Sequence, residues 1–465
     1  MVQRATYLFF LIAGLCFFGN VHSHAADCGK NRNTVLSNQL LTRAIPFLKV
    51  KKTDSALVYL DKSVSADPCN ISALWEAGWA YYQAEKWQKV CELWGRVKEL
   101  QPSTPGLSIN LKMAQERASV QMYLDTVTLN SDVTIDTIAD VSQTVSVTAV
   151  GDIQLGRAWP EEYAALPDGG PEALLDQVSP YLKDDITFGN LETVLSNTGG
   201  TMKGLRGKQG IFVFRVPVSY ASGLKNAGFT VLGTANNHAN DFKTEGMYAT
   251  MNALDSAKIL HSGKTGVVAS WNVKGVRVCM VAYSNQESAY TIQDSLNVWK
   301  RIRSLDLNHD IVIVSFHGGA EGRQANRIKD TVEYYYGENR GNAFKFARWA
   351  VDAGADLVLG HGPHVLRGME KYRGRLIAYS LGNFSSYKSF VTDGALSYSI
   401  ILKVSLAKNG VCKQASVIPL VFNADGKPGI DNDKNAISML NTLSTEDLKS
   451  TAVVFDSSGN VDFTK

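Results

Sequence analysis

The chain has 465 residues, of which 20% are charged and 45% apolar, and its formal net charge is +3. These values are ordinary for a globular protein, and they exclude a disordered chain and a nucleic-acid binder that relies on a large basic surface. At roughly 150 residues per domain, the length predicts about three folding units. Only one apolar run, residues 6–18, approaches membrane length, and it is shorter than the ~20 residues that a membrane-spanning helix needs. A polytopic membrane protein is therefore excluded.

Residues 1–25 have the pattern of an export signal. Arg4 supplies the positive start, an apolar stretch follows as far as Phe18, and small residues before and at Ala25 mark a cleavage site. We expect cleavage after Ala25 and export of the mature protein to the periplasm or cell envelope, where it does not span the membrane. An uncleaved N-terminal anchor is the alternative.

Six cysteines occur in the chain, and Cys16 lies in the signal, which leaves five. Because five is odd, at least one thiol is free or pairs with another molecule. The five are scattered and include no C-x-x-C pair, so neither a thiolate metal site nor a disulfide scaffold is expected. Cys279 lies inside an apolar run and is predicted to be a buried small hydrophobe.

Residues 34–125 contain a repeat, whose period of 34 residues separates Pro68 from Pro102. The small residues Ala44 and Gly78 stand at equivalent places, where they allow two helices to approach closely, and each proline ends the second helix of its pair. The segment resembles tetratricopeptide repeats; an unrelated pair of helical hairpins is the alternative. It carries no catalytic constellation, so we expect a small all-α domain that binds a protein partner or acts as a spacer.

The polar residues 126–144 are expected to form a linker. From Val145 onward, apolar runs rich in β-formers alternate with helical patterns, which predicts an α/β domain over residues 145–425. The chain then becomes polar again, and residues 426–465 are assigned to a C-terminal tail with one short helical signal. The predicted strands are residues 145–150, 186–188, 231–232, 276–283, 311–316, 357–359 and 376–379.

Five of these strands deliver metal-competent side chains at their carboxyl ends. In order, the side chains are Asp152, Asn190 with Glu192, Asn237 with His238, His317, and His361 with His364. Ligands bind beyond the carboxyl ends of strands in α/β sheets, so the five segments are expected to converge on one cleft. Imidazole, carboxylate and amide groups suit Mn²⁺, Zn²⁺, Fe²⁺ or Mg²⁺, and the candidates exceed what one four-coordinate zinc needs. Two divalent metal ions are therefore expected.

Six motifs carry a resemblance to a known family. They are Val150-Gly151-Asp152-Ile153, Gly189-Asn190-Leu191-Glu192, Ala235-Asn236-Asn237-His238 with Asp241, Phe316-His317-Gly318-Gly319 with Glu321, Gly360-His361-Gly362-Pro363-His364-Val365-Leu366, and Tyr379-Ser380-Leu381-Gly382-Asn383-Phe384. In this order they resemble the CapA family, the poly-γ-glutamate capsule biosynthesis proteins, which is similar to the calcineurin-like metallophosphoesterases. The resemblance implies a four-layer α/β/β/α sandwich with a dimetal cleft at the strand ends.

The resemblance also implies a role for each candidate residue. His238 would face the substrate as a proton donor or transition-state stabiliser. Asn190 is placed with the substrate-binding groups, together with Arg157, a candidate for gripping a substrate anion that could equally be a solvated surface arginine. The metal ligands would be Asp152, Glu192, Asn237, His317, His361 and His364.

Three functions remain open. The favoured one is an exported metal-dependent hydrolase that acts on a phosphoester or phosphate-bearing anionic surface polymer during capsule synthesis of the poly-γ-glutamate type. The second is metal-assisted handling of a γ-linked polyglutamate amide. The third is a non-catalytic, metal-stabilised binding or assembly subunit of a polymer export complex. Gln154 stands where the phosphoesterase pattern has a histidine, and Asn190 where it has a bridging aspartate, and both substitutions support the third function.

Overall fold

A computed structural model describes Cys28 and residues 32–50, 52–84, 86–108, 110–112, 114–115, 118, 143–198, 202–203 and 212–463. The chain divides into two compact units, residues 1–130 and 131–465. The export signal expected over residues 1–25 lies outside the described residues. In the part of the chain that is described, no helix combines the length and the apolar character that crossing a bilayer requires.

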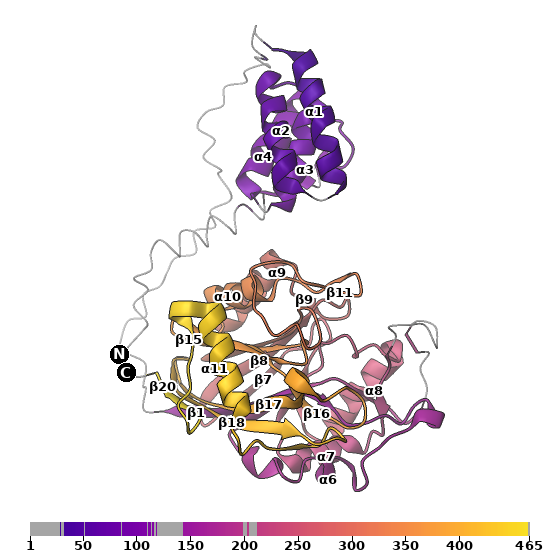
Figure 1. Cartoon of the computed structure of the whole chain (residues 1–465), viewed down its shortest axis with the longest axis vertical. Helices are drawn as coiled ribbons and strands as arrows, with labels where there is room; N and C mark the ends of the chain where they lie inside the picture. Colours follow the sequence, from indigo (N-terminus) through magenta and orange to yellow (C-terminus); the bar gives the residue numbers. More distant parts are fainter. Residues whose placement is uncertain are drawn as a thin grey trace. The chain divides into compact units, whose positions relative to one another are not determined.

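The first unit is built from helical hairpins, drawn in indigo and violet in Figure 1. Its helices are α1 (Thr34–Lys49), α2 (Thr53–Ala66), α3 (Ile71–Gln83) and α4 (Trp87–Leu100). Gly78 of α3 lies directly against Trp94 of α4: a Cβ atom at Gly78 would come within 2.0 Å of Trp94 Nε1. The close helix approach expected from the small residues is therefore present, and the segment is helical as predicted.

A disulfide joins Cys28 to Cys69. It joins the chain before α1 to the connection between α2 and α3. The sequence does not signal this pair, because its members are 41 residues apart and have no local spacing pattern. Cys279, by contrast, is fully buried, as its apolar surroundings predict.

The second unit contains two large β-sheets. The strands of the first sheet, in spatial order, are β19 (Pro428–Ile430), β18 (Cys412–Phe422), β17 (Tyr398–Ala407), β1 (Thr144–Gln154), β2 (Ile186–Leu191), β5 (Val231–Gly233) and β6 (Leu260–Ser262). Two short strands are added to this order: β16 (Asn383–Ser386) pairs with β1, and β20 (Asn460–Asp462) pairs with β18. The strands of the second sheet are β14 (Leu366–Tyr372), β15 (Arg375–Leu381), β13 (Leu357–His361), β10 (Ile311–His317), β8 (Val276–Ser284) and β7 (Ala269–Val273), with β9 (Tyr290–Thr291) paired to β8.

Each sheet has a parallel centre. The strands β1, β2 and β5 run parallel in the first sheet, and β8, β10, β13 and β15 run parallel in the second. All seven predicted strands coincide with these central strands. In each sheet the carboxyl ends of the parallel strands therefore lie along one edge.

Helices and short elements complete the unit. The helices are α6 (Gly170–Leu174), α7 (Tyr220–Ala227), α8 (Lys243–Ser256), α9 (Ser295–Asp306), α10 (Ala343–Ala353) and α11 (Asn435–Leu448). The single turns of 3₁₀-helix are η1 (Glu161–Tyr163), η2 (Ser179–Tyr181), η3 (Gly394–Ser397) and η4 (Lys449–Thr451). Two small sheets pair β3 (Val194–Leu195) with β4 (Arg215–Val216), and β11 (Tyr334–Tyr335) with β12 (Glu338–Asn339).

Three apolar clusters separate four layers. The cluster between the two sheets joins Phe188 of β2 to Ile313 of β10. A second cluster packs α6, α7 and α8 on the outer face of the first sheet, through side chains such as Leu224. A third packs α9 and α10 on the outer face of the second sheet, through side chains such as Phe346. This layering is the predicted α/β/β/α sandwich, and the predicted fold class is confirmed.

The expected C-terminal tail, residues 426–465, is part of this sandwich. The helix α11, drawn in yellow in Figure 1, contacts β14 of one sheet and β18 of the other, and β20 adds a strand beside β18. Ile437 and Leu440 of α11 belong to the cluster between the sheets. The polar composition of the segment concealed this packing, because its buried apolar residues are few: one face of α11, and Val453 and Phe455 after it.

Candidate metal centre

The site lies where the carboxyl ends of both parallel centres meet. Asp152 of β1 is in register with Asn190 of β2, and His317 of β10 is in register with His361 of β13. The backbone of β1 passes close to Gly382: a Cβ atom at Gly151 would come within 2.0 Å of the Gly382 carbonyl oxygen, and Asp152 N donates to the same oxygen at 2.9 Å. Glycine at this position lets Asp152 sit against the turn that leads into β16.

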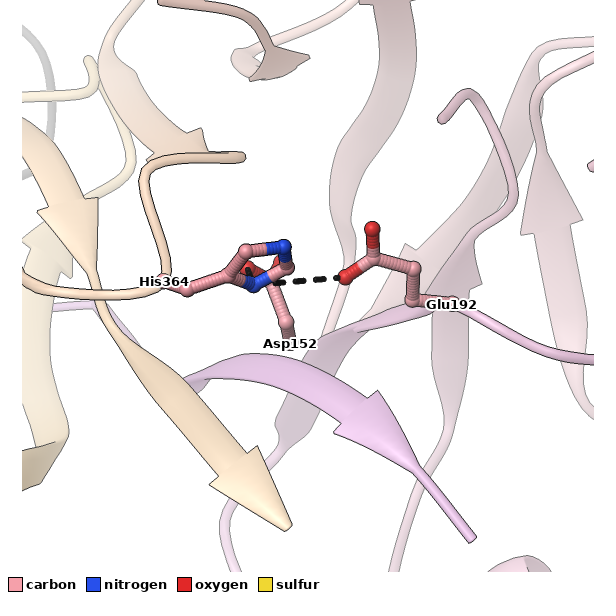
Figure 2. A group of neighbouring side chains, drawn as sticks. All are labelled: Asp152, Glu192 and His364. Carbon is pink, nitrogen blue, oxygen red and sulfur yellow. Dashed lines mark ion pairs between the residues drawn. The ribbon is translucent and has the colours of Figure 1, made fainter. Parts of the chain in front are cut away.

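Asp152, Glu192 and His364 form the tightest group of potential metal ligands (Figure 2). His364 Nδ1 is 3.2 Å from Asp152 Oδ2 and 3.8 Å from Glu192 Oε2. Both carboxylates are 0% exposed and His364 is 6% exposed. Asp152 lies near the end of β1, Glu192 directly follows β2, and His364 lies in the connection after β13, so the structure brings together three side chains from the carboxyl ends of predicted strands.

The charges in this group are poorly compensated by the protein alone. Neither oxygen of Glu192 accepts a hydrogen bond from any described residue. Burial raises the pKa of Glu192 well above its ordinary value, and the charge of Asp152 adds to this effect. Burial also acts to raise the pKa of Asp152, but the hydrogen bond and charge of His364 outweigh it and lower that pKa.

His364 supplies the positive charge in the metal-free protein. Burial acts to lower its pKa, but Glu192, Asp152 and Glu321 together raise it to about 10. A buried pair of carboxylates needs a cation, and two carboxylates with an imidazole are a donor set that binds divalent metals. The three side chains therefore fit a metal ion, which would take the place of the His364 proton.

Asn383 is a fourth donor at this position, and the sequence analysis did not identify it. Its Oδ1 lies 2.9 Å from His364 Nδ1, and its Nδ2 has no hydrogen-bond partner within the described residues. It is in register with Asp152, on the neighbouring strand β16. Asn383 could have been recognised from its place in the motif of residues 379–384, which follows the predicted strand 376–379.

His238 and Asp241 form a pair beside this group. His238 Nδ1 lies 2.9 Å from Asp241 Oδ2, and His238 Nε2 is 3.9 Å from Glu192 Oε1. Lys203 Nζ contacts Asp241 Oδ1 at 2.5 Å, which balances the buried carboxylate. Burial lowers the pKa of His238, although the charge of Asp241 acts against this shift.

Two further predicted metal ligands, His317 and Asn237, lie close to the Arg340 guanidinium and its partner Glu321. His317 Nε2 lies 3.2 Å from Arg340 Nη2 and 3.7 Å from Glu192 Oε1. Arg340 Nη2 also pairs with Glu321 Oε1 at 2.8 Å. Asn237 Nδ2 lies 3.5 Å from the same Glu321 oxygen, and Asn237 Oδ1 has no hydrogen-bond donor among the described residues. The sequence analysis did not single out Arg340, and it named Glu321 only as part of a motif.

Asn190 faces the site through its amide nitrogen. Its Nδ2 donates to Asp152 Oδ1 at 2.8 Å, and its Oδ1 accepts from Asn236 Nδ2 at 3.1 Å. Asn190 therefore orients Asp152 and does not face a substrate directly. Gln154 is also turned away, because its side chain exchanges two hydrogen bonds with the backbone of Gly156.

Two predicted site residues lie apart from the group. Arg157 donates from Nε to the Tyr163 carbonyl and does not line the cavity described below. His361 places Nε2 3.2 Å from the Val150 carbonyl oxygen, while its Nδ1 has no hydrogen-bond partner in the described chain. Donation from Nε2 would leave Nδ1 with its lone pair, which is the tautomer of a ligating histidine, but His361 is outside the tight group of ligand atoms.

The group opens into a cavity of about 650 Å³. His238, His364, Asn237, Glu321 and Arg340 contribute to its lining, so the proton-carrying, acidic and cationic groups share one space. The wall also includes the more exposed aromatic side chains Phe212, Tyr335, Tyr336 and Phe390. The cavity can therefore hold a substrate with both charged and apolar parts.

Fold and site together define a class: an α/β/β/α sandwich protein with a candidate metal centre at the carboxyl ends of its parallel strands. Residues 146–388 match the family described as bacterial capsule synthesis protein PGA_cap, and the chain belongs to this family. The predicted resemblance to CapA proteins is confirmed.

Individual relatives agree with this assignment. The chain is 30% identical to the capsule biosynthesis protein CapA of Bacillus anthracis over 52% of its own length and 60% of that protein. It is 27% identical to the PGA biosynthesis protein CapA of Bacillus subtilis over 57% of its own length and 69% of that protein. Less than two thirds of the Bacillus anthracis protein is therefore matched.

Solved structures give more distant matches. A 5′-nucleotidase precursor from Thermus thermophilus matches with a TM-score of 0.32 and 14% identity, over 65% of this chain and 59% of that one. A purple acid phosphatase from yellow lupin seeds matches with a TM-score of 0.30 and 11% identity, over 62% of this chain and 53% of that one.

Proposed function

We propose that the protein is a metal-dependent hydrolase that cleaves a phosphoester during the synthesis of a capsule or other anionic surface polymer. The observation that carries this proposal is the buried group of Asp152, Glu192 and His364, in which both Glu192 oxygens lack hydrogen-bond donors among the described residues. It opens on the cavity that His238 lines. A buried acid and a proton-carrying histidine beside one cavity are the groups that metal-assisted hydrolysis requires.

Each residue of the site has a role in the proposal. Asp152, Glu192 and His364 would hold a divalent cation, which would supply Lewis-acid activation of water and of a phosphoryl oxygen. Asp241 holds the His238 ring through Nδ1, so that Nε2 is the nitrogen that would take up a proton from water and pass it to the leaving oxygen. Asn190 fixes the orientation of Asp152.

The proposed location is the periplasm or cell envelope. The Cys28–Cys69 disulfide supports it, because disulfides persist in oxidising compartments. The helical first unit would dock a protein partner of the polymer pathway, which is the role that repeated helical hairpins commonly serve. Partner and polymer are both part of the proposal.

A second function is favoured by one observation. Asn190 presents an N–H group to Asp152 at the position where a bridging carboxylate is expected, and this arrangement does not help to activate water. The protein would then be a metal-stabilised binding or assembly subunit of a polymer export complex, and its cavity would hold the polymer without cleaving it.

Metal content and turnover of the purified full chain distinguish the two functions. We expect bound metal after incubation with Mn²⁺, and Mn²⁺-dependent hydrolysis of bis(p-nitrophenyl) phosphate. His238→Gln is expected to keep the metal and to lower kcat by about 100-fold or more, because one general acid typically contributes this much. His261→Gln is the matched control, because His261 pairs with Asp255 and does not line the cavity.

The outcomes have separate meanings. Bound metal without turnover of the phosphodiester would favour the binding subunit. A protein that binds no metal would overturn both functions. Full activity in His238→Gln would leave the metal centre in place and remove His238 from the mechanism.

A further inference from the structure

Arg340 lies among the groups that a second metal ion would need. Its side chain is only 1% exposed, and its Nη2 contacts both His317 Nε2 and Glu321 Oε1. A guanidinium group can only donate hydrogen bonds, so His317 Nε2 must be the acceptor in this contact. His317 Nδ1 also faces a donor, Asn190 Nδ2 at 3.3 Å, so both ring nitrogens of His317 are directed at groups of the protein.

The backbone on both sides of Arg340 is fixed, so the guanidinium is held in this position. Arg340 N donates to the Glu333 carbonyl at 2.9 Å, and the Arg340 carbonyl accepts from Gly319 N at 2.9 Å. Glu333 is itself held by the buried guanidinium of Arg367, at 2.9 and 2.6 Å. The hairpin of β11 and β12 ends at this anchored point, which delivers Arg340 to the site.

Arg340 supplies positive charge beside the acidic groups of the site. Its Nη2 pairs with Glu321 Oε1 at 2.8 Å, and its Nη1 lies 3.3 Å from Glu338 Oε2. The guanidinium therefore stands where a second divalent cation would otherwise be needed to neutralise these carboxylates.

We propose that Arg340 replaces the second metal ion of a dimetal centre. The protein would then hold one divalent cation, at Asp152, Glu192 and His364, and a fixed guanidinium at His317 and Glu321. This inference depends on the metal centre of the proposed function. Because Arg340 also lines the cavity, its guanidinium can bind the oxygens of a phosphoryl group, which a second metal would otherwise do.

The test counts metal ions, so it is independent of activity. The full chain is saturated with Mn²⁺, passed over a desalting column and analysed for metal per chain. We expect one Mn²⁺ in the wild type. Arg340→Met is expected to bind two, because it frees His317 Nε2, Glu321 and Asn237 Oδ1, and the spin coupling of two neighbouring Mn²⁺ ions would appear in its electron paramagnetic resonance spectrum.

Three further variants serve as controls. Arg340→Lys keeps the positive charge and is expected to stay at one Mn²⁺. Arg323→Met removes an exposed arginine of the same segment, which pairs with Asp393, and should change nothing. His317→Ala should also retain one Mn²⁺, because His317 faces the guanidinium, and this variant keeps the test informative if Arg340→Met does not fold.

The possible failures are distinct. Two Mn²⁺ ions in the wild type, or loss of Mn²⁺ in His317→Ala, would overturn the inference and leave the proposed metal centre standing. One Mn²⁺ in a folded Arg340→Met variant would also overturn it. A wild type that binds no Mn²⁺ would instead overturn the metal centre of the proposed function.

Discussion

Asp356 is a buried acid that lies outside the candidate metal centre. It immediately precedes β13, where its Oδ2 accepts from Val312 N at 2.8 Å and its Oδ1 lies 3.2 Å from Arg375 Nη2. Burial raises its pKa to about 7, and the neighbouring Asp306 adds to the shift, although Arg375 and the Val312 hydrogen bond act against it. The protein must therefore keep a costly buried charge above neutral pH.

We predict that this group makes the protein less stable as the pH rises. The folded pKa of about 7 exceeds the ordinary value of 3.8, so the folded state holds a proton that the unfolded state has released between these two pH values. The contribution of Asp356 to the free energy of unfolding should fall by roughly 2–3 kcal/mol between pH 5 and pH 8. Asp356→Asn keeps an acceptor for Val312 N and should remove this part of the slope.

Denaturant unfolding of both proteins at several pH values measures the difference. Asp310→Asn is the control, because Arg277 lowers the pKa of Asp310 and its contribution is constant over the same pH range. Equal slopes for the wild type and Asp356→Asn would show that Asp356 is ionised throughout.

At the residue scale, the structure brings together side chains that lie at the ends of predicted strands. Asp152, Glu192 and His364 could be found in this way, because the carboxyl ends of parallel strands must meet. Arg340 could not, since it lies 23 residues beyond His317 and reaches the site through a hairpin. Residue patterns in the sequence do not give the path of such a long connection. Arg157 lies close to Asp152 in sequence, but in the structure it donates to the Tyr163 carbonyl and does not line the cavity.

At the level of elements, the α3–α4 contact depends on the absence of a side chain. Gly78 lets the ring of Trp94 lie against the α3 backbone, and Trp94 also packs with the rings of Trp75, Trp79 and Tyr82. Trp94 is fully buried, so the ring has no open space into which it could move. The contact therefore fixes the distance between the two helices.

We predict that Gly78→Ala destabilises the first unit by about 1–3 kcal/mol, which is the usual cost of overpacking a core. Gly95→Ala is the matched control on α4, because a Cβ atom at Gly95 would meet nothing within 4 Å. This change should stabilise the helix by roughly 0.5–1 kcal/mol, since alanine is the better helix former. Urea unfolding of the full chain, followed by tryptophan fluorescence, measures both. A neutral Gly78→Ala would mean that α3 and α4 lie further apart.

Strands could be predicted from the sequence where burial makes a continuous run of residues apolar. The seven central strands are buried on both faces and appear as apolar runs, so the sequence locates them. The strands β17 and β18 were not predicted, and partly exposed residues interrupt the buried positions, above all in β18. The strand β17 pairs with β1, which lies far away in sequence, and β18 then pairs with β17 as the next strand along the chain.

For the second unit as a whole, the core extends beyond the part of the chain that matches the family. The match ends at residue 388, but β17, β18 and α11 all contribute to the cluster between the sheets. The helix α11 lies so close to β14 that a Cβ atom at Gly368 would come within 2.8 Å of Ser444 Cα. Ser444 Oγ also accepts from Met369 N at 2.9 Å. The C-terminal segment is therefore a structural part of the sandwich that carries the site.

We predict that Leu440→Ala lowers the free energy of unfolding of this unit by about 2–5 kcal/mol, because Leu440 is fully buried between the sheets. Thr445→Ala, on the exposed face of the same helix, should change it by less than about 0.5 kcal/mol. Guanidinium unfolding followed by circular dichroism gives both values. If α11 were an independent tail, Leu440→Ala would leave the main transition unchanged. Since the carboxyl ends of both sheets must stay in register to bring Asp152 and His364 together, Leu440→Ala should also release bound Mn²⁺ at lower denaturant concentration than Thr445→Ala does.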